Sequence, residues 1–161
     1  SPMSNNETPN ATTSAASAPQ LALQAVYLKD CSFESPQGPR VTGEWNPQIG
    51  LDLNTALNMI EGDLREVVLT VTVSAKVGER TMFLVEVKQA GAFVMQNLSG
   101  EDLRRAAGAI CPAVLFPYAR AMVSQLVTQG GFPQLLLPPV NFDALFAGSA
   151  QSADGAGVTK N

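Results

Sequence analysis

Apolar and polar residues alternate along four stretches of the chain, and this alternation predicts four β-strands. The first stretch runs from Gln20 to Glu34, and its odd positions are mostly apolar. Successive side chains of a strand point to opposite faces of a sheet, so a period of two predicts one buried face. The side chains predicted to face inward are Leu21, Leu23, Ala25, Tyr27, Cys31 and Phe33, with Lys29 as the exception, whereas Gln24, Asp30, Ser32 and Glu34 are predicted to face outward.

The next three stretches have the same period. The second strand is predicted after Pro47, the third over 66–77 and the fourth from Arg80 onward. Between the last two, Gly78-Glu79 predicts a tight turn and therefore an antiparallel pair. The predicted inward residues are Ile49, Leu51 and Leu53, then Val67, Leu69, Val71, Val73, Ala75 and Val77, then Phe83, Val85 and Val87; Leu84, Glu86 and Lys88 are predicted to face the opposite way.

The pattern becomes helical after Ser99, which is predicted to cap a helix from Glu101. Pro112 and Pro117 are expected to break or kink this helix, since proline lacks the backbone donor. The more regular part is predicted over 119–129, where Gly130-Gly131 ends it. Beyond an apolar, proline-rich linker, Asn141 is predicted to cap a short final helix over 142–147.

Strands first and helices last indicate an α+β fold: a four-stranded antiparallel sheet with one long, kinked helix and a short C-terminal helix covering one face. The folded domain is predicted over 20–147. Residues 1–19 and 148–161 are rich in small and polar residues and are predicted to be a disordered N-terminal tail and a flexible C-terminal tail.

Composition narrows the function. The hydrophobic fraction of 45% is enough for a packed core, and the net charge of −4 argues against nucleic acid or an anionic membrane as the main partner. The sequence suggests no apolar run of the roughly 18–20 residues that cross a bilayer and no signal peptide. We therefore expect a cytoplasmic protein without membrane insertion.

The chain lacks the side chains that most enzymes use. It has no histidine, no phosphate-binding glycine loop and no nucleophile elbow. Cys31 and Cys111 are too few for a zinc site. They could form one disulfide, or remain two free buried thiols, as a reducing cytosol favours. We expect neither an enzyme nor a bound cofactor.

Two groups of residues are candidates for binding. Asp30, Glu34, Leu84 and Glu86 are predicted to share the exposed sheet face, together with Lys76 and Lys88. Such a face is most simply a solvated one, but an outward leucine beside a carboxylate also suits a basic partner. The second group is apolar: Trp45, Phe132, Leu135, Leu136, Leu137, Phe142, Leu145 and Phe146. Core packing explains any one of these, but together they indicate a surface for self-assembly, for ligand binding, or for both.

Several ordered blocks over about 20–146 resemble the SecB family. The blocks are Leu28-Lys29-Asp30-Cys31-Ser32-Phe33-Glu34, Trp45-Asn46-Pro47, Leu51-Asp52-Leu53, Phe83-Leu84-Val85-Glu86-Val87, Cys111-Pro112, Leu115-Phe116-Pro117-Tyr118-Ala119-Arg120, Phe132-Pro133-Gln134-Leu135, and Pro139-Val140-Asn141-Phe142-Asp143-Ala144-Leu145-Phe146. The resemblance implies a homotetramer, a dimer of dimers, that binds unfolded precursor proteins without ATP and delivers them to the SecA translocase ATPase. It assigns SecA binding to Asp30, Glu34, Leu84 and Glu86, and client binding to Trp45, Ile49, Leu51, Leu53, Leu145 and Phe146.

The chain departs from the family pattern at Arg65, where relatives often have an aromatic residue, and in a C-terminal tail with few acidic residues. Two other functions remain open. One is a SecB-like chaperone dedicated to a single partner such as an antitoxin. The other is an unrelated acyl or lipid binder that uses the apolar surface.

Overall fold

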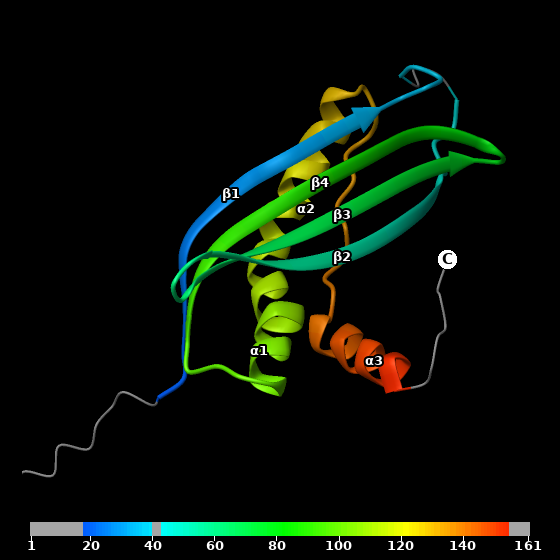
Figure 1. The fold of residues 1–161 in the computed structure, drawn as a ribbon. Helices are drawn as coiled ribbons and strands as arrows, with labels where there is room; N and C mark the ends of the chain where they lie inside the picture. Colours follow the sequence, from blue (N-terminus) through cyan, green and yellow to red (C-terminus); the bar gives the residue numbers. More distant parts are fainter. Residues whose placement is uncertain (1–17, 40–42, 155–161) are drawn as a thin grey trace, which may run out of the picture.

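The computed structural model describes residues 18–39 and 43–154. Its four strands are β1 (Gln20–Glu34), β2 (Gln48–Glu61), β3 (Leu64–Val77) and β4 (Arg80–Gln96). They form one sheet in the order β1-β4-β3-β2, in which every neighbouring pair is antiparallel. The helices lie on one side of this sheet (Figure 1). The predicted fold class is therefore confirmed, and β1 and β2 are the two edge strands.

The core lies between β3, β4 and the long helix. Odd-numbered residues of β3, and those of β4 from Phe83 onward, share the helix-covered face, because Val71 pairs with Val87 and Val73 with Val85. These valines are fully buried and pack with Leu115, Ala119 and Val123 of the helix in one cluster. The even-numbered residues of the same two stretches lie on the opposite, helix-free face. The predicted orientation of β3 and β4 is thus confirmed.

In β1 the predicted orientation is wrong for Ala25 and Tyr27. The pairing of β1 with β4 contains two irregularities, one at Gln24 and one at Lys29. Each extra residue is a β-bulge, which shifts the alternation of side chains by one position. Tyr27 therefore pairs with Ala90 on the helix-free face, whereas Val26 and Leu28 turn toward the helices. The second bulge restores the original alternation, so Asp30 and Glu34 face away from the helices as predicted.

The long helix is continuous through both prolines. It consists of α1 (Glu101–Arg105), a π-helical turn η2 (Ala106–Ile110) and α2 (Cys111–Gln129), with Pro117 inside α2. Of the expected break or kink, the helix therefore shows no break, as the predicted single long helix requires. The wider π turn comes directly before Pro112, whose ring would clash with the carbonyl group four residues earlier in a regular helix. The predicted cap at Ser99 is also wrong, since Gly100 takes that position with φ of 56° and no side chain caps the helix.

The span Glu101–Gln129 is long and apolar enough to cross a membrane by length and composition alone. The prediction that the chain has no apolar run of this length is therefore wrong. In the structure α2 packs on β3 and β4, and eight of its residues are buried. Those features are typical of the core helix of a folded domain.

A linker connects α2 to the final helix, α3 (Phe142–Asp154), and runs beside α2 (Figure 1). Phe132 and Leu137 of this linker are buried, as is Phe142 at the start of α3. Core packing therefore accounts for these three apolar residues. Asn141 caps α3 as predicted, because its Oδ1 accepts a hydrogen bond from the Ala144 amide at 3.0 Å. The helix continues to Asp154, beyond the predicted end at residue 147. Of the tails predicted at 1–19 and 148–161, residues 1–17 and 155–161 lie outside the described residues.

Candidate functional site: an acidic sheet end and an apolar groove

The four residues of the first candidate group lie at one end of the helix-free face. Glu34 pairs with Leu84 across β1 and β4, Ser32 pairs with Glu86, and Asp30 pairs with Lys88. Glu34 and Asp30 are exposed, and Leu84 is 38% exposed. The structure therefore places all four along one stretch of this face, with the accessible Leu84 opposite Glu34. We call Asp30, Glu34, Leu84 and Glu86 the acidic end of the sheet.

Sequence reasoning missed Asp52, which lies in the same row of the sheet as Glu86. Asp52 pairs with Thr72, and Thr72 pairs with Glu86 and donates a hydrogen bond to its Oε2 at 3.5 Å. Neighbouring strands are about 4.8 Å apart, so the two carboxylates are separated by roughly 10 Å of sheet. The alternation of β2 already put Asp52 on the polar side, but only the order β4-β3-β2 aligns it with Glu86.

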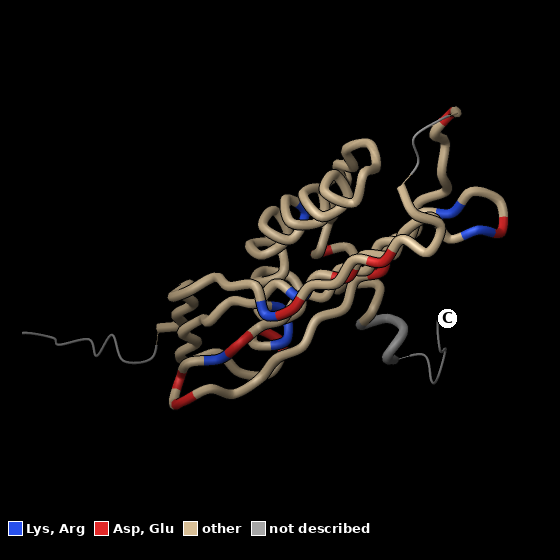
Figure 2. Tube along the Cα trace, turned by 90° about the horizontal axis from the view of Figure 1, so that it is seen from above, with Lys and Arg blue, Asp and Glu red and all other residues tan. Residues whose placement is uncertain are grey.

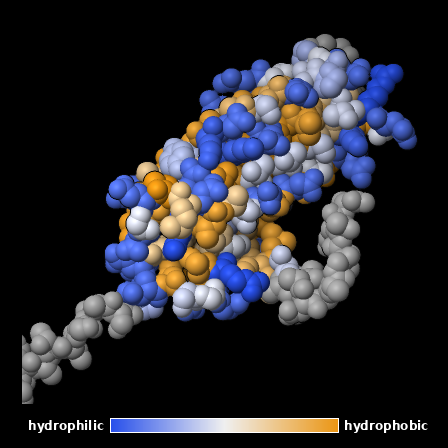
Figure 3. Space-filling view, viewed as in Figure 1, coloured by the Kyte–Doolittle hydropathy of each residue, from blue (hydrophilic) through white to orange (hydrophobic). Residues whose placement is uncertain are grey.

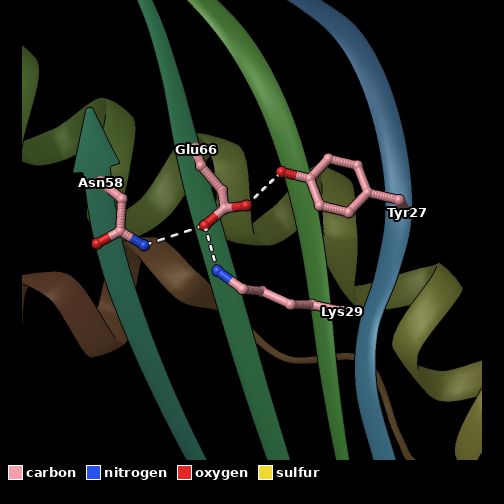
Figure 4. A network of polar contacts seen from close by, with 4 residues as sticks. All are labelled: Tyr27, Lys29, Asn58 and Glu66. Atoms are coloured by element: carbon pink, nitrogen blue, oxygen red, sulfur yellow. Dashed lines mark hydrogen bonds and ion pairs between the residues drawn. The ribbon is translucent and has the colours of Figure 1, made fainter. Parts of the chain in front are cut away.

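A polar network lies on the helix-free face (Figure 4), toward the turn between β2 and β3. Glu66 on β3 accepts hydrogen bonds from the Tyr27 hydroxyl, from Lys29 Nζ at 2.7 Å and from Asn58 Nδ2 at 3.0 Å. Tyr27 and Lys29 reach Glu66 across β4, where Ala90 and Ala92 have small side chains. The network thus joins β1, β3 and β2 on this face.

The negative charge of Glu66 has a positive partner, Lys29. Hydrogen bonding to Lys29, followed by that to Tyr27, lowers the pKa of Glu66 to about 2. Burial, together with the Glu66 carboxylate, raises the pKa of Tyr27 to about 12. Glu66 is therefore ionised at neutral pH, and its charge is balanced by Lys29. As a result, the Glu66 network adds little net charge to this face.

The second candidate site is a row of apolar side chains along β2. Ile49, Leu51 and Leu53 pair with Ala75, Val73 and Val71, so they lie on the helix-covered face. The helices do not cover this edge of the sheet: Ile49 and Leu51 are exposed, as is Leu57 further along, and Leu53 is half-buried. The spacing from Ile49 to Leu57 is roughly 26 Å, the length of about eight residues of extended chain. We call this row the β2 groove and include in it Trp45 at one end and Phe146 at the other.

Aromatic side chains form one end of the β2 groove. Trp45 lies 5.3 Å from Phe132 and 6.4 Å from Phe83, measured between ring centroids. Phe83 pairs with Ala75, which in turn pairs with Ile49, so this cluster lies at the Ile49 end. Trp45 is half-buried and keeps part of its ring accessible.

Helix α3 forms the other end. A hollow of about 300 Å³ lies between β2, η2 and α3, and Leu57, Ala107, Gly108 and Phe146 are among its lining residues. The Phe146 ring fits against Gly108, where an added Cβ would come within 2.8 Å of the ring. An ion pair of 3.1 Å between Arg105 and Asp143 also holds α3 to α1. Leu145 is 50% exposed on α3 and does not line the hollow.

Charged residues are concentrated on the sheet rather than on α2 (Figure 2). Charged residues lie along the strands and their turns, whereas α2 carries only Arg120 (Figure 2). Hydrophilic side chains cover much of the face seen in Figure 3, with apolar ones between them. Such mixed surfaces suit protein partners.

The remaining candidate chemistry is limited. In residues 18–39 and 43–154 no three His, Cys, Asp or Glu side chains come together as metal ligands would. Both cysteines are free: Cys111 is buried, as expected, whereas Cys31 is exposed, contrary to the expectation of two buried thiols. Burial raises the pKa of the Cys111 thiol to about 12, so it stays protonated and unreactive at neutral pH.

Comparisons with known proteins give a consistent family. The family model described as "Preprotein translocase subunit SecB" matches residues 14–153. A protein named "Protein-export protein SecB" from Ectopseudomonas mendocina is 50% identical over 140 residues, which cover 86% of this chain and 87% of the relative. A protein of the same name from Pseudomonas paraeruginosa is 53% identical over 131 residues, covering 80% of each chain.

A solved structure shares the fold. It is a SecB-like chaperone from Mycobacterium tuberculosis, in complex with a peptide from an antitoxin. The similarity has a TM-score of 0.66 at 15% sequence identity, and it covers 74% of this chain and 90% of that one. The family match over residues 14–153 and the two relatives with about 50% identity show that the protein belongs to the SecB family of protein-export proteins.

Proposed function

We propose that this protein is an ATP-independent chaperone of the cytoplasm that binds unfolded precursor proteins and delivers them to the SecA motor. Membership of the SecB family supports the export role. The observation that carries the proposal is the β2 groove, an apolar row that the chain's own helices leave exposed. A folded protein hides its apolar segments, so such a groove recognises chains that have not yet folded.

The energetics suit a reversible holding reaction. Each apolar side chain that a client buries contributes roughly 1.5–3 kcal/mol, and several fit along the groove. Ordering an unfolded segment opposes this gain, so the net affinity of one groove is moderate. A dimer of dimers would carry four such grooves and raise the affinity for a long client by avidity.

Exposed apolar side chains support the proposed assembly. Ile110, Val114 and Tyr118 recur every four residues on the outer side of the long helix, and each is more than a third exposed. Leu23 and Leu28 of β1 are exposed as well. Contact between copies of the chain would remove these side chains from water.

The acidic end of the sheet is the proposed SecA contact. It offers carboxylates around Leu84, and Asp52 extends the negative surface toward β2. Opposite charges raise the rate of association, while a central apolar contact slows dissociation. The docking face and the β2 groove lie on opposite faces of the sheet, so SecA and a client could bind at the same time.

Binding assays with one precursor test the proposal. The protein should bind the unfolded precursor, but not the folded one, with equal affinity in the presence and absence of ATP. A complex of protein and precursor should then bind SecA. Equal binding of folded and unfolded precursor would refute the holding role, and failure of the complex to bind SecA would refute delivery. Capture of one antitoxin-like protein, without precursors, would instead favour a dedicated chaperone.

A further inference from the structure

Arg65 places a cation beside the β2 groove. It precedes Glu66 in β3 and therefore lies on the opposite, helix-covered face of the sheet. Its neighbours in the sheet are Met59 on β2 and Phe93 on β4, and Phe93 is buried on that face. Arg65 itself is only half-buried, so its guanidinium is accessible from the groove side.

The guanidinium has a weak partner. Its Nε donates to Met59 Sδ at 3.3 Å, and a thioether sulfur is a poor acceptor. Within the described part of the chain, no carboxylate forms an ion pair with Arg65. The two nearby arginines differ, because Arg104 pairs with Glu101 at 3.5 Å and Arg105 pairs with Asp143 at 3.1 Å. Of these three cations, Arg65 is the one whose charge the fold leaves unbalanced.

Arg65 also lies near the Leu57 end of the β2 groove, where one end of a bound client segment would be. Met59 is 67% exposed and is the next groove-side residue of β2 after Leu57, which lines the hollow under Phe146. A segment extended from the Trp45 end to the Leu57 end would bring its last residues to Met59 and Arg65. The β2 groove therefore has a cationic side chain beside its Leu57 end.

We propose that Arg65 makes this groove select unfolded segments that carry an Asp or Glu directly beside their apolar residues. The inference rests on the proposed client binding in the β2 groove and adds the class of segment preferred there. An arginine presents up to five donors in a planar fork that matches a carboxylate. A client carboxylate would replace the thioether as the partner and balance the charge.

The expected preference is modest because the site is partly exposed. Ion pairs in such positions change binding by about two- to fivefold at low salt. Salt screens them over about 10 Å at 0.1 M, so the preference should shrink as ionic strength rises. The apolar contribution of the client should change far less.

Three synthetic peptides test the inference. They share one apolar segment of about eight residues, end in Glu, Gln or Lys, and have an amidated C-terminus, so that only the Glu side chain supplies a carboxylate there. The full-length protein should bind the Glu peptide about two- to fivefold more tightly than the Gln peptide, and the Lys peptide most weakly. Arg65→Gln should abolish this order, Arg65→Lys should retain it, and Arg65→Glu should reverse it.

Arg104→Gln is the matched control, since Arg104 lines the hollow but is already paired with Glu101. It should keep most of the preference for the Glu peptide. Binding of all three peptides without a charge preference, or a preference that persists in Arg65→Gln, would overturn the role of Arg65 and leave the groove intact. Failure of the wild-type protein to bind any of the peptides would overturn the groove itself.

Discussion

Glu34 and Leu84 lie directly opposite each other on β1 and β4, on the face of the sheet that the helices leave free. Side chains paired in this way have their Cβ atoms about 4.5–5.5 Å apart. The exposed Leu84 side chain therefore lies beside the Glu34 carboxylate. Glu86 follows Leu84 by two residues and lies on the same face. That composition underlies the first prediction.

Glu86→Lys should weaken SecA binding more than Glu86→Gln, because reversal adds repulsion to the lost attraction. Binding of the wild-type protein should also weaken as salt rises. Calorimetry of each variant with SecA measures the effect, alongside a thermal melt and a client-binding assay that should stay unchanged. Asp52→Lys should show a smaller loss in the same assay. Normal SecA binding by Glu86→Lys would show that the docking assignment is wrong.

Replacing Trp45 or Phe146 by Asp should reduce client affinity by about tenfold or more, since each contributes apolar contact at one end of the β2 groove. Fluorescence anisotropy with an unfolded precursor measures this change. Leu136→Asp is the control, because Leu136 is 61% exposed and lies in the linker rather than on β2. Unchanged affinity in both groove variants would mean that clients bind elsewhere.

Light scattering near neutral pH at micromolar concentration should give four times the chain mass of 16.9 kDa. Val114→Glu together with Tyr118→Glu should lower that mass, because both side chains are exposed on the outer side of α2. The two introduced carboxylates would be buried between copies of the chain without an oppositely charged group to pair with, which opposes assembly. A monomer mass for the wild-type protein across this concentration range would contradict the proposed tetramer.

The Glu66 network should make stability depend on pH. The pKa of Glu66 falls from 4.5 to about 2 on folding, so its contribution is present above pH 4.5 and is lost as the pH falls toward 2. At about 1.4 kcal/mol per pKa unit, the upper bound is roughly 3 kcal/mol. The pKa of Tyr27 rises to about 12, so its contribution is present below pH 10 and is lost as the pH rises toward 12.

Urea melts between pH 7 and pH 3 measure the contribution of Glu66 as the difference between wild type and Glu66→Gln. The difference should be largest at pH 7 and should shrink as the solution is acidified. Glu61→Gln, at the turn between β2 and β3, is the control for loss of one carboxylate. A difference that is constant with pH would show that the network does not hold Glu66 ionised.

Gly130→Ala should destabilise the fold by about 1–3 kcal/mol. A Cβ at Gly130 would lie 2.2 Å from Cζ of Phe33, whose ring stacks on Phe83. A thermal melt checks this, with Gly148→Ala as the control, because a Cβ there meets nothing within 4 Å. A melting temperature equal to that of the control would mean that the Phe33 ring moves aside at little cost.

Sequence periodicity predicted the strands, the termination of α2 and the Asn141 cap because each depends on neighbours in the chain. It failed at Tyr27, whose ring is amphipathic and fits either face, and whose partner Glu66 is 39 residues away. At Pro112 it left a break and a kink as alternatives, and it did not predict the single π turn that relieves the clash that proline normally causes. The unbalanced charge of Arg65 could not be found either, since it depends on which carboxylates the fold brings near the other arginines.

The two bulges of β1 have a consequence for how the length of this strand can vary. If Gln24 and Lys29 are left out, the remaining residues alternate without a break: Leu21, Leu23, Val26, Leu28, Cys31 and Phe33 on one face, and Ala22, Ala25, Tyr27, Asp30, Ser32 and Glu34 on the other. The two bulged residues therefore act as insertions into a regular strand. Deleting either one would leave every other side chain on its present face, whereas deleting Val26 or Tyr27 would move a neighbouring side chain to the wrong side. Natural insertions and deletions in β1 should therefore concentrate at these two positions.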